Sequence, residues 1–348
     1  MTEVVKGKMK AALLYRPMEL EIEYVDLPKV GDDEVLVHVK NVGICPSDVR
    51  SYEGVYKRQM FPFGRESYGL SGHEWCGEIV MLGKNVREFS IGDRVVPEII
   101  LPCGRCRLCL SGKTNLCRNK RNIGRGFAEY AKAPYDYLFK IPEGVSCAEA
   151  AFTEPIAVCL HANDIISPKP GETVLVIGGG PMGLINMQIS RLSGANVIVS
   201  EVVESRLAKA KELGADYIIN PTTVDLAKTV KDLTDGYGAD AIIVATGNKT
   251  AIEAAFKAVS PAGKIVFFGG TYPPAFVEID PNLVHYEEVL ITGSYDHTPN
   301  HVERALKILS KKAVDVDRLI SHVFPLDKLR EAFEMVKSAS ALKVQVTP

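Results

Sequence analysis

Four cysteines lie close together in the sequence, in the segment "LPCGRCRLCLSGKTNLCRNK". They are Cys103, Cys106, Cys109 and Cys117, with the spacing C-x2-C-x2-C-x7-C. Four thiolates can close the tetrahedral shell of a zinc ion. An iron–sulfur cluster and four free thiols are the alternatives that the spacing leaves open. A zinc ion with four protein ligands has no open position for a substrate, so we expect this site to be structural and the chemistry to lie elsewhere.

A second set of possible metal ligands is spread over separate segments. "NVGICPSD" carries Cys45, "LSGHEWCGE" carries His73 next to Glu74, and "TEPIAVCLHA" carries Glu154. Thiolate, imidazole and carboxylate all bind zinc, and a site with three protein ligands keeps an open position, as catalytic zinc sites do. None of these residues is decisive alone. The other cysteines are expected to be small apolar side chains of the fold: Cys76, Cys147 and Cys159.

A glycine-rich segment, "VLVIGGGPMG", has the pattern of a dinucleotide-binding turn. Gly178, Gly180 and Gly183 form G-x-G-x-x-G between an expected strand and an expected helix. The first glycine permits the tight turn, the second lets the backbone approach a pyrophosphate, and the third permits close helix–strand packing. The helix N-terminus then offers N–H groups to the phosphates. A glycine turn without a ligand is the alternative.

Glu201 ends the next expected strand, near the position about 20 residues on where such folds carry an acidic residue. A carboxylate there hydrogen-bonds the adenosine ribose and repels a 2′-phosphate, which favours NAD over NADP. Arg206 follows and could stack on adenine or support some use of NADP.

The elements that must position these residues divide the chain in two. Up to about residue 155, short strand-like runs such as "EVLVHVKNVGI" are separated by turn signals, which predicts an all-β, barrel-like unit. From about residue 170, strands and helices alternate from "ETVLVIGGG" to "KIVFFGG", and a last strand, "EEVLITGSY", follows. This alternation predicts a doubly wound parallel sheet covered by helices.

The composition is that of a soluble globular protein, and nothing in it suggests a surface that binds nucleic acid or a membrane. The chain has 348 residues, a formal net charge of −2 and 24% charged residues. "MTEVVKGKMK" has no signal-peptide pattern, and no stretch approaches the roughly 20 apolar residues of a membrane span. We therefore expect a cytoplasmic protein, where clustered cysteines more often bind metal than form disulfides.

These motifs together resemble the zinc-dependent medium-chain dehydrogenases over nearly the whole chain. "GHEWCGEIV", "CPSD", "PCGRCRLCLSGKTNLC" and "VIGGGPMG" are similar to family signatures, while "TEPIAVCLHA" and "SHVFPLDKLREAFEMVKS" resemble the sorbitol (polyol) dehydrogenase branch. The resemblance implies a GroES-like β-barrel catalytic domain over residues 1–157, with a structural-zinc lobe at about 100–120. It also implies a Rossmann domain over 158–296 and a return to the catalytic domain over 297–348. A homo-oligomer, tetramer or dimer, is expected on the same basis.

The resemblance also implies a role for each site residue. Cys45, His73 and Glu74 would bind a catalytic zinc, and Glu154 would be its fourth ligand or hold its water. Ser47 would relay a proton. The cofactor NAD would contact Met182, Glu201 and Arg206, and the four clustered cysteines would hold a structural zinc. The implied reaction is reversible oxidation of a secondary alcohol, of polyol or sugar-derived type, to a ketone.

Some positions depart from the family pattern. Pro46 replaces a glycine, and Arg50 stands near the place of a relay histidine. "GSYDHTP" replaces the arginine and tyrosine of sorbitol dehydrogenases with Asp296 and His297, which speaks against sorbitol itself. Three basic residues could meet an acidic or phosphorylated substrate, or be solvated loop charges: Lys57, Arg58 and Arg65.

Two rival functions follow from the same sequence. L-threonine 3-dehydrogenase shares the expected zinc sites and the glycine turn, although "TEPIAVCLHA" favours the polyol branch. A zinc-ribbon module that binds nucleic acid would use the locally basic "CRNKRNIGRGF", but the chain as a whole is mildly acidic, which opposes this reading.

Overall fold

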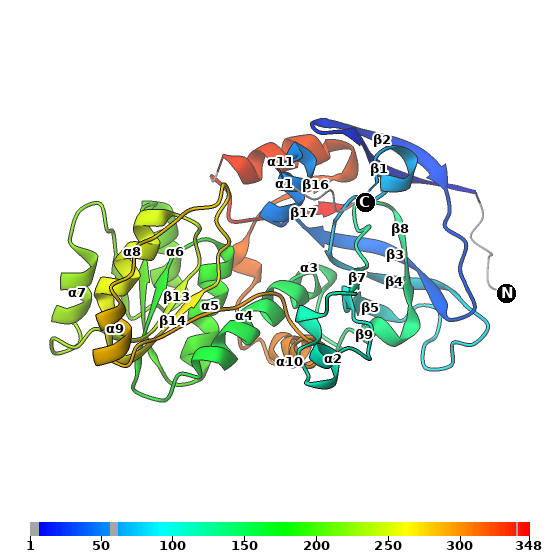
Figure 1. The fold of residues 1–348 in the computed structure, drawn as a ribbon. Coiled ribbons are helices and arrows are strands. Elements are labelled where there is room, and N and C mark those ends of the chain that lie inside the picture. Colours follow the sequence, from blue (N-terminus) through cyan, green and yellow to red (C-terminus); the bar gives the residue numbers. More distant parts are fainter. Residues whose placement is uncertain (1–6, 56–61, 339) are drawn as a thin grey trace. The chain divides into compact units, whose positions relative to one another are not determined.

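A computed structural model describes residues 7–55, 62–338 and 340–348, and the chain divides into two compact units. The first comprises Met1–Glu154, Thr298–Lys312 and Val316–Pro348, and the second comprises Pro155–His297 and Ala313–Asp315. The predicted pairing of an α/β unit with a β unit is confirmed, because one unit holds a fully parallel sheet and the other a mainly antiparallel one (Figure 1).

The second unit is built on six parallel strands in the order β12-β11-β10-β13-β14-β15, the order of a doubly wound dinucleotide-binding sheet. The strands are β10 (Thr173–Ile177), β11 (Asn196–Ser200), β12 (Tyr217–Ile219), β13 (Ala239–Val244), β14 (Val259–Phe267) and β15 (Leu290–Gly293). The helices are α4 (Thr153–Ile166), which begins in the first unit, α5 (Pro181–Leu192), α6 (Glu204–Glu212), α7 (Leu226–Asp232), α8 (Lys249–Ala258) and α9 (Pro281–Tyr286).

The central strands of this sheet are buried runs of branched side chains, as parallel strands covered on both faces require. Leu175, Ile198, Ile242 and Ile265 form the middle of its core. The alternation of such runs with helices made this part of the fold readable from the sequence.

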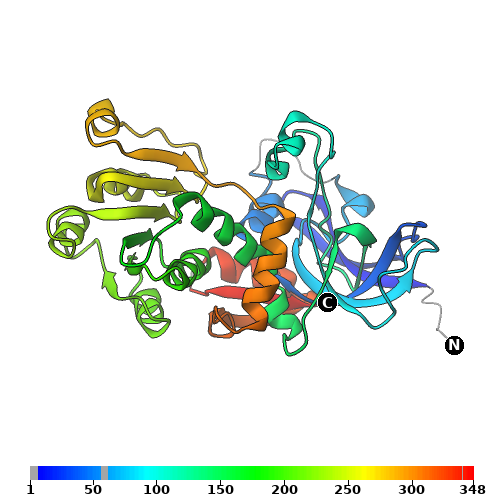
Figure 2. The ribbon, with the colours of Figure 1, turned by 90° about the horizontal axis from the view of Figure 1, so that it is seen from below.

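The outer strand β15 has a different character. Within the described residues it pairs with β14 alone, at the edge of the sheet (Figure 2). Leu290 at its start is half exposed. Phe276, Tyr286 and Tyr295, which flank it in sequence, are also exposed. An exposed apolar edge of this kind can contact another molecule. The homo-oligomer stays a prediction.

The first unit centres on a seven-stranded sheet, with strand order β16-β17-β3-β4-β5-β9 and β8 paired to β3. Its strands are β3 (Glu34–Gly43), β4 (Glu74–Leu82), β5 (Arg94–Pro97), β8 (Tyr130–Pro134), β9 (Leu138–Lys140), β16 (Ile320–Pro325) and β17 (Lys343–Thr347). Two smaller antiparallel pairs accompany it: β1 (Lys8–Arg16) with β2 (Glu19–Asp26), and β6 (Ile100–Leu101) with β7 (Arg121–Asn122).

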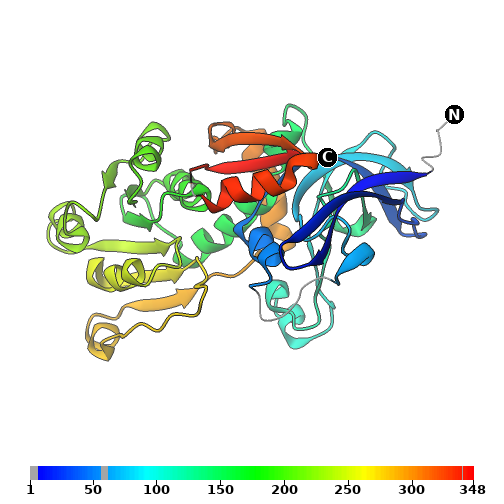
Figure 3. The same cartoon turned by 90° about the horizontal axis from the view of Figure 1, so that it is seen from above.

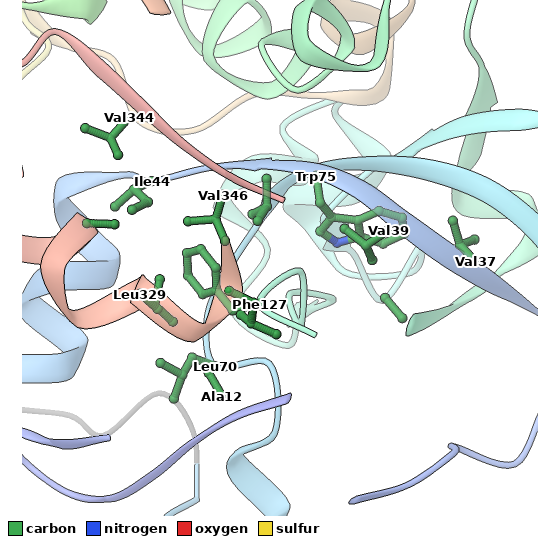
Figure 4. Packing of buried hydrophobic residues seen from close by; sticks show 14 of the residues in the cluster. Ala12, Val37, Val39, Ile44, Leu70, Trp75, Phe127, Leu329, Val344 and Val346 are labelled. Carbon is green, nitrogen blue, oxygen red and sulfur yellow. The ribbon is translucent and has the colours of Figure 1, made fainter. Parts of the chain in front are cut away.

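The C-terminal segment completes this sheet. Gln345 and Val346 of β17 pair with Gly43 and Val42 of β3, so the last strand of the chain lies beside one of the first. Helix α11 (Leu329–Lys337) packs next to β17 (Figure 3). Leu329 of that helix is fully buried in one cluster with Phe127 and Trp75 (Figure 4). Phe333 belongs to the same cluster and is also fully buried. Segments from both ends of the sequence therefore pack together to stabilise this sheet.

The remaining helices of the first unit are short, apart from α10 (Pro299–Ser310). They are α1 (Pro46–Glu53), α2 (Arg107–Leu110) and α3 (Cys147–Ala150). Within the described ranges, no helix has both the length and the apolar character needed to cross a membrane.

Candidate active site

Strand pairing brings the second set of expected metal ligands together. In the antiparallel ladder of β3 and β4, Gly43 lies opposite Glu74, and Cys45 follows Gly43 by two residues at the start of α1. His73 precedes the first residue of β4. As a result, the ligand atoms of Cys45, His73 and Glu74 all lie within 4.8 Å of one another.

The Asp48 side chain connects two of these ligands, Cys45 and His73. Its carboxylate is almost fully buried, at 1% exposure. One oxygen, Oδ2, accepts a hydrogen bond of 2.9 Å from the backbone N–H of Cys45. The other, Oδ1, accepts a hydrogen bond from the Ser71 hydroxyl and lies 3.2 Å from Nδ1 of His73. One buried carboxylate thus positions residues from both ligand-bearing segments.

The contact between Asp48 and His73 fixes which imidazole nitrogen is available. With Nδ1 turned toward the carboxylate, Nε2 is the nitrogen left for a metal, an arrangement common to metal-binding histidines. Burial alone would lower the pKa of His73, but the charges and hydrogen bonds of Asp48 and Cys45 raise this pKa well above its usual value. A metal ion on Nε2 would take the place of the proton that Asp48 stabilises on this ring.

Glu74 has a partner that the sequence did not reveal. Lys343, in the last strand, forms an ion pair with its carboxylate, and the two residues are only 4% and 2% exposed. Burial acts to lower the pKa of Lys343, but Glu74, Cys45 and Glu154 outweigh it and raise this pKa. A methyl group on Gly43 would overlap the Glu74 carboxylate and contact the Lys343 side chain, so the pair depends on that glycine. The Glu74 carboxylate can thus either bind a metal ion or remain in its ion pair with Lys343.

The donor set fits a zinc ion. A thiol, an imidazole nitrogen held by a carboxylate, and a second carboxylate are a combination that zinc accepts. Ser47 lies in the first turn of α1, two residues after Cys45, and is partly exposed. Glu154 is the second residue of α4 and acts on the charge of Lys343. Asp48, Ser71 and Lys343 were not predicted as site residues, although the aspartate of "CPSD" was a visible signal for the first.

The four clustered cysteines converge around one point. Their ligand atoms all lie within 4.8 Å of one another, with Sγ separations of 3.4 Å for Cys106–Cys109, 3.9 Å for Cys106–Cys117 and 4.0 Å for Cys103–Cys109. A zinc tetrahedron with bonds of about 2.3 Å places sulfur atoms about 3.8 Å apart. Backbone N–H groups of Arg105 and Cys106 lower the pKa of Cys103 to about 6, which favours the thiolate that zinc requires.

The glycine-rich turn lies between β10 and α5, as predicted. Gly178 has a φ of 110°, a conformation that favours glycine. A methyl group on Gly183 would overlap the Gly178 carbonyl, while Gly180, the residue before α5, has open space in front of it. Met182 lies in the first turn of α5. This combination gives a turn whose backbone a phosphate can approach.

Glu201 lies directly beside this turn. Its Oε2 accepts a hydrogen bond of 2.7 Å from the Gly179 N–H, and its Oε1 accepts two more from Val202 and Val203, at 2.7 and 3.0 Å. Arg206 lies 3.9 Å from the same carboxylate. Glu201 is thus a fixed negative charge at the end of β11, and Arg206 partly compensates it.

The other residues singled out in the sequence differ in position and exposure. Lys57 and Arg58 lie outside the described residues, and Arg65 is exposed. Asp296 and His297 form a close side-chain pair, 3.3 Å apart, at the end of the second unit. Cys76 and Cys159 are fully buried, as expected of small apolar side chains, but Cys147 is partly exposed.

Comparison with known families places both halves of the chain. Residues 31–143 match the alcohol dehydrogenase GroES-like domain, and residues 181–311 match the zinc-binding dehydrogenase family.

Three curated proteins are similar over almost their full length. The chain is 34% identical to D-arabitol-phosphate dehydrogenase of Enterococcus avium, covering 99% of this chain and 98% of that protein. It is 35% identical to sorbitol dehydrogenase of Halalkalibacterium halodurans, with 92% and 93% covered. It is also 34% identical to L-threonine 3-dehydrogenase of Pyrococcus horikoshii, with 97% and 98% covered.

Two solved structures have the same fold. A zinc-binding dehydrogenase of Sinorhizobium meliloti bound to NADP superposes with a TM-score of 0.92 at 32% identity, covering 99% of this chain and 100% of that one. An Escherichia coli alcohol dehydrogenase complexed with NADH superposes with a TM-score of 0.88 at 30% identity, covering 98% and 99%.

The two ligand sets generate a first prediction. Purified, zinc-replete protein should contain about two zinc ions per chain. His73→Ala should lose about one of them with a smaller fall in melting temperature than Cys106→Ser, because the buried Asp48 carboxylate keeps the Cys45 N–H and the Ser71 hydroxyl as partners. Cys106→Ser should also lose about one, but its melting temperature should fall by several degrees, since a closed structural zinc contributes to folding. Elemental analysis and differential scanning calorimetry measure both quantities.

The opposite changes in melting temperature would contradict the assignment of one structural and one catalytic zinc site. If His73→Ala lowered the melting temperature strongly while Cys106→Ser left it unchanged, the clustered cysteines would not form the structural site. A single zinc per chain in the unmodified protein would remove one site altogether.

The buried ion pair generates a second prediction. In metal-free protein, Lys343→Met leaves the Glu74 carboxylate buried without a counter-charge and should destabilise the fold by about 3–5 kcal/mol. Lys343→Arg should cost less, because the charge is kept. Adding Glu74→Gln to Lys343→Met should restore much of the loss, and this double-mutant cycle is measured by urea unfolding. Equal stability of Lys343→Met and unmodified metal-free protein would show that the pair does not form.

Proposed function

The chain belongs to the zinc-dependent medium-chain dehydrogenases and is an alcohol or polyol dehydrogenase, and we propose that it oxidises a secondary alcohol of polyol or sugar-derived type to a ketone with NAD. The observation that carries this proposal is the grouping of Cys45, His73 and Glu74 within 4.8 Å, with His73 held by the buried Asp48. Such a three-ligand set leaves a position for a substrate oxygen, unlike the set of four cysteines.

Each residue of the group has a task in this proposal. When bound, zinc supplies a Lewis acid that lowers the pKa of an alcohol hydroxyl. Asp48 keeps Nε2 of His73 available and orients the ring. The buried Lys343 forms an ion pair with Glu74, so that this carboxylate either binds the metal or stays paired with Lys343. Ser47, partly exposed and close to Cys45 in sequence, is the group that we propose to relay the hydroxyl proton, accepting it while its own proton passes on toward the cofactor ribose and solvent.

We propose that Glu154 acts next to this group rather than within it. Its charge acts on Lys343, which in turn contacts Glu74. Glu154 would therefore hold a water molecule or act as an alternative ligand when Glu74 stays with Lys343. This division of roles between the two glutamates agrees with the buried ion pair.

The cofactor proposal rests on the second unit. NAD supplies the acceptor of the hydrogen and electron pair removed from the alcohol carbon. The turn from Gly178 to Gly183 would take its pyrophosphate, with Met182 at the helix start. The Glu201 carboxylate, fixed by three backbone N–H groups, would repel the 2′-phosphate of NADP. Arg206 beside it offers a route to residual use of NADP, the cofactor bound in the Sinorhizobium meliloti structure.

We infer the class of substrate from the similar dehydrogenases and from one sequence difference between this chain and sorbitol dehydrogenases. D-arabitol-phosphate and sorbitol dehydrogenases suggest a polyhydroxylated chain, with or without a phosphate. Asp296 and His297 differ from the residues of sorbitol dehydrogenases, so we propose a substrate other than sorbitol. L-threonine remains the second candidate, because a threonine dehydrogenase is equally similar to this chain.

A substrate panel tests the proposal. We expect reduction of NAD, followed by absorbance of the reduced cofactor, with at least one alditol, inositol, sugar acid or alditol phosphate, at a kcat/KM at least about tenfold above that for L-threonine. NAD should give a higher kcat/KM than NADP, and Glu201→Gln should narrow that preference. His73→Ala is the matched inactive control and should lower kcat by several orders of magnitude.

Two results would contradict the proposal. Preference for L-threonine over every polyhydroxylated compound would move the chain to the second candidate. Higher kcat/KM with NADP in the unmodified enzyme would show that Arg206, not Glu201, decides the cofactor.

A further inference from the structure

Two cysteines outside both metal-ligand sets lie against each other in the first unit. Cys76 is in β4 and fully buried, whereas Cys147 is the first residue of α3 and partly exposed. The Cys76 thiol donates a hydrogen bond of 2.9 Å to the backbone carbonyl of Cys147. A buried thiol thus contacts the backbone of a second cysteine that is partly exposed.

Buried polar contacts fix the segments that carry these thiols. Cys76 pairs with Asn41 in the ladder of β3 and β4. Gln345, with no exposed surface, accepts a hydrogen bond of 3.1 Å from the Asn41 side chain and donates one of 2.8 Å to the carbonyl of Ala148. This one side chain connects the strand beside Cys76 with the residue after Cys147, so the contact between the Cys76 thiol and the Cys147 backbone is part of the folded structure.

The surroundings of Cys147 carry positive charge. Arg94 of β5 donates hydrogen bonds of 2.7 and 3.4 Å to the carbonyls of Val145 and Pro142, in the loop that leads to Cys147. The hydrogen bond with Cys76 and the charges of Arg94 and Lys40 lower the pKa of Cys147 to about 6, against the effect of burial. Reactive cysteines combine thiolate character, positive neighbours and access to solvent.

We propose that Cys76 and Cys147 form a peroxide-sensitive dithiol, in which Cys147 is the reacting thiol and Cys76 the resolving one. The Cys147 thiolate attacks one oxygen of hydrogen peroxide. The O–O bond breaks, a sulfenic acid forms on Cys147, and hydroxide leaves and takes up a proton to become water. The Cys76 sulfur then attacks the sulfenic sulfur, an S–S bond forms, and the S–O bond breaks with loss of a second water.

The step is balanced and reversible. Two thiols lose two electrons and two protons, and one hydrogen peroxide is reduced to two waters. A dithiol reductant returns both cysteines to thiols by exchange. The disulfide would link β4, which begins at Glu74, with α3. The proposal does not depend on the function proposed above, since neither cysteine belongs to a ligand set.

Peptide mapping of the zinc-loaded full-length protein tests the proposal. After brief treatment with about one equivalent of hydrogen peroxide and alkylation, mass spectrometry should find the peptides of Cys76 and Cys147 joined. Dithiothreitol should separate them. In Cys76→Ser, the linked peptide should be absent, and dimedone should trap a sulfenic acid on Cys147. In Cys147→Ser, Cys76 should stay unmodified. Arg94→Gln should slow labelling of Cys147 by about tenfold, whereas Arg94→Lys should slow it less.

Controls separate the pair from the zinc cysteines and from misfolding. Zinc content before and after treatment reports on the four clustered cysteines, and the melting temperature shows whether each variant is folded. If the folded, zinc-loaded protein forms no link between Cys76 and Cys147, the dithiol is absent. If Cys147 reacts no faster than the buried Cys159, or if Arg94→Gln leaves its rate unchanged, the proposed activation of Cys147 is wrong.

Discussion

The candidate site depends on one buried carboxylate, that of Asp48. It receives the N–H of Cys45 on one oxygen, and the Ser71 hydroxyl and the His73 ring on the other. These three partners come from the start of α1 and from the approach to β4, so a single side chain fixes how the two segments meet. A buried carboxylate needs such partners, because each unsatisfied oxygen would cost several times more than an ordinary hydrogen bond contributes. The ligand geometry is therefore a consequence of how this charge is satisfied.

A second buried charge brings the end of the chain into the same arrangement. Lys343 reaches Glu74 because β17 pairs with β3 at the point where β3 faces the start of β4. The ion pair gives Glu74 a stable state without metal, and a metal ion must compete with Lys343 for the carboxylate. The same strand carries Gln345, which positions α3. One C-terminal strand thus adjusts both the candidate zinc site and the dithiol of Cys76 and Cys147.

Some features of this protein are encoded within a single segment of the sequence, whereas others depend on how distant segments pair. The four cysteines and the glycine turn were readable because their spacing within one segment is the signal, and β10 to β15 because each strand is a buried apolar run beside a helix. The pairing of Glu74 with Lys343 was not readable, because it depends on strand order and register across the whole chain. The character of Cys147 was also missed, since Arg94 and Gln345 act on it from β5 and β17.

We propose that Cys45 and His73, positioned by Asp48, hold one zinc ion while the four clustered cysteines hold another. Anomalous diffraction recorded on both sides of the zinc absorption edge, from crystals of zinc-replete protein, tests it most directly. We expect two anomalous peaks per chain, one bonded to Cys45 and His73 and one at the centre of Cys103, Cys106, Cys109 and Cys117. A zinc-replete crystal with a peak at the four cysteines and none at Cys45 and His73 would contradict it.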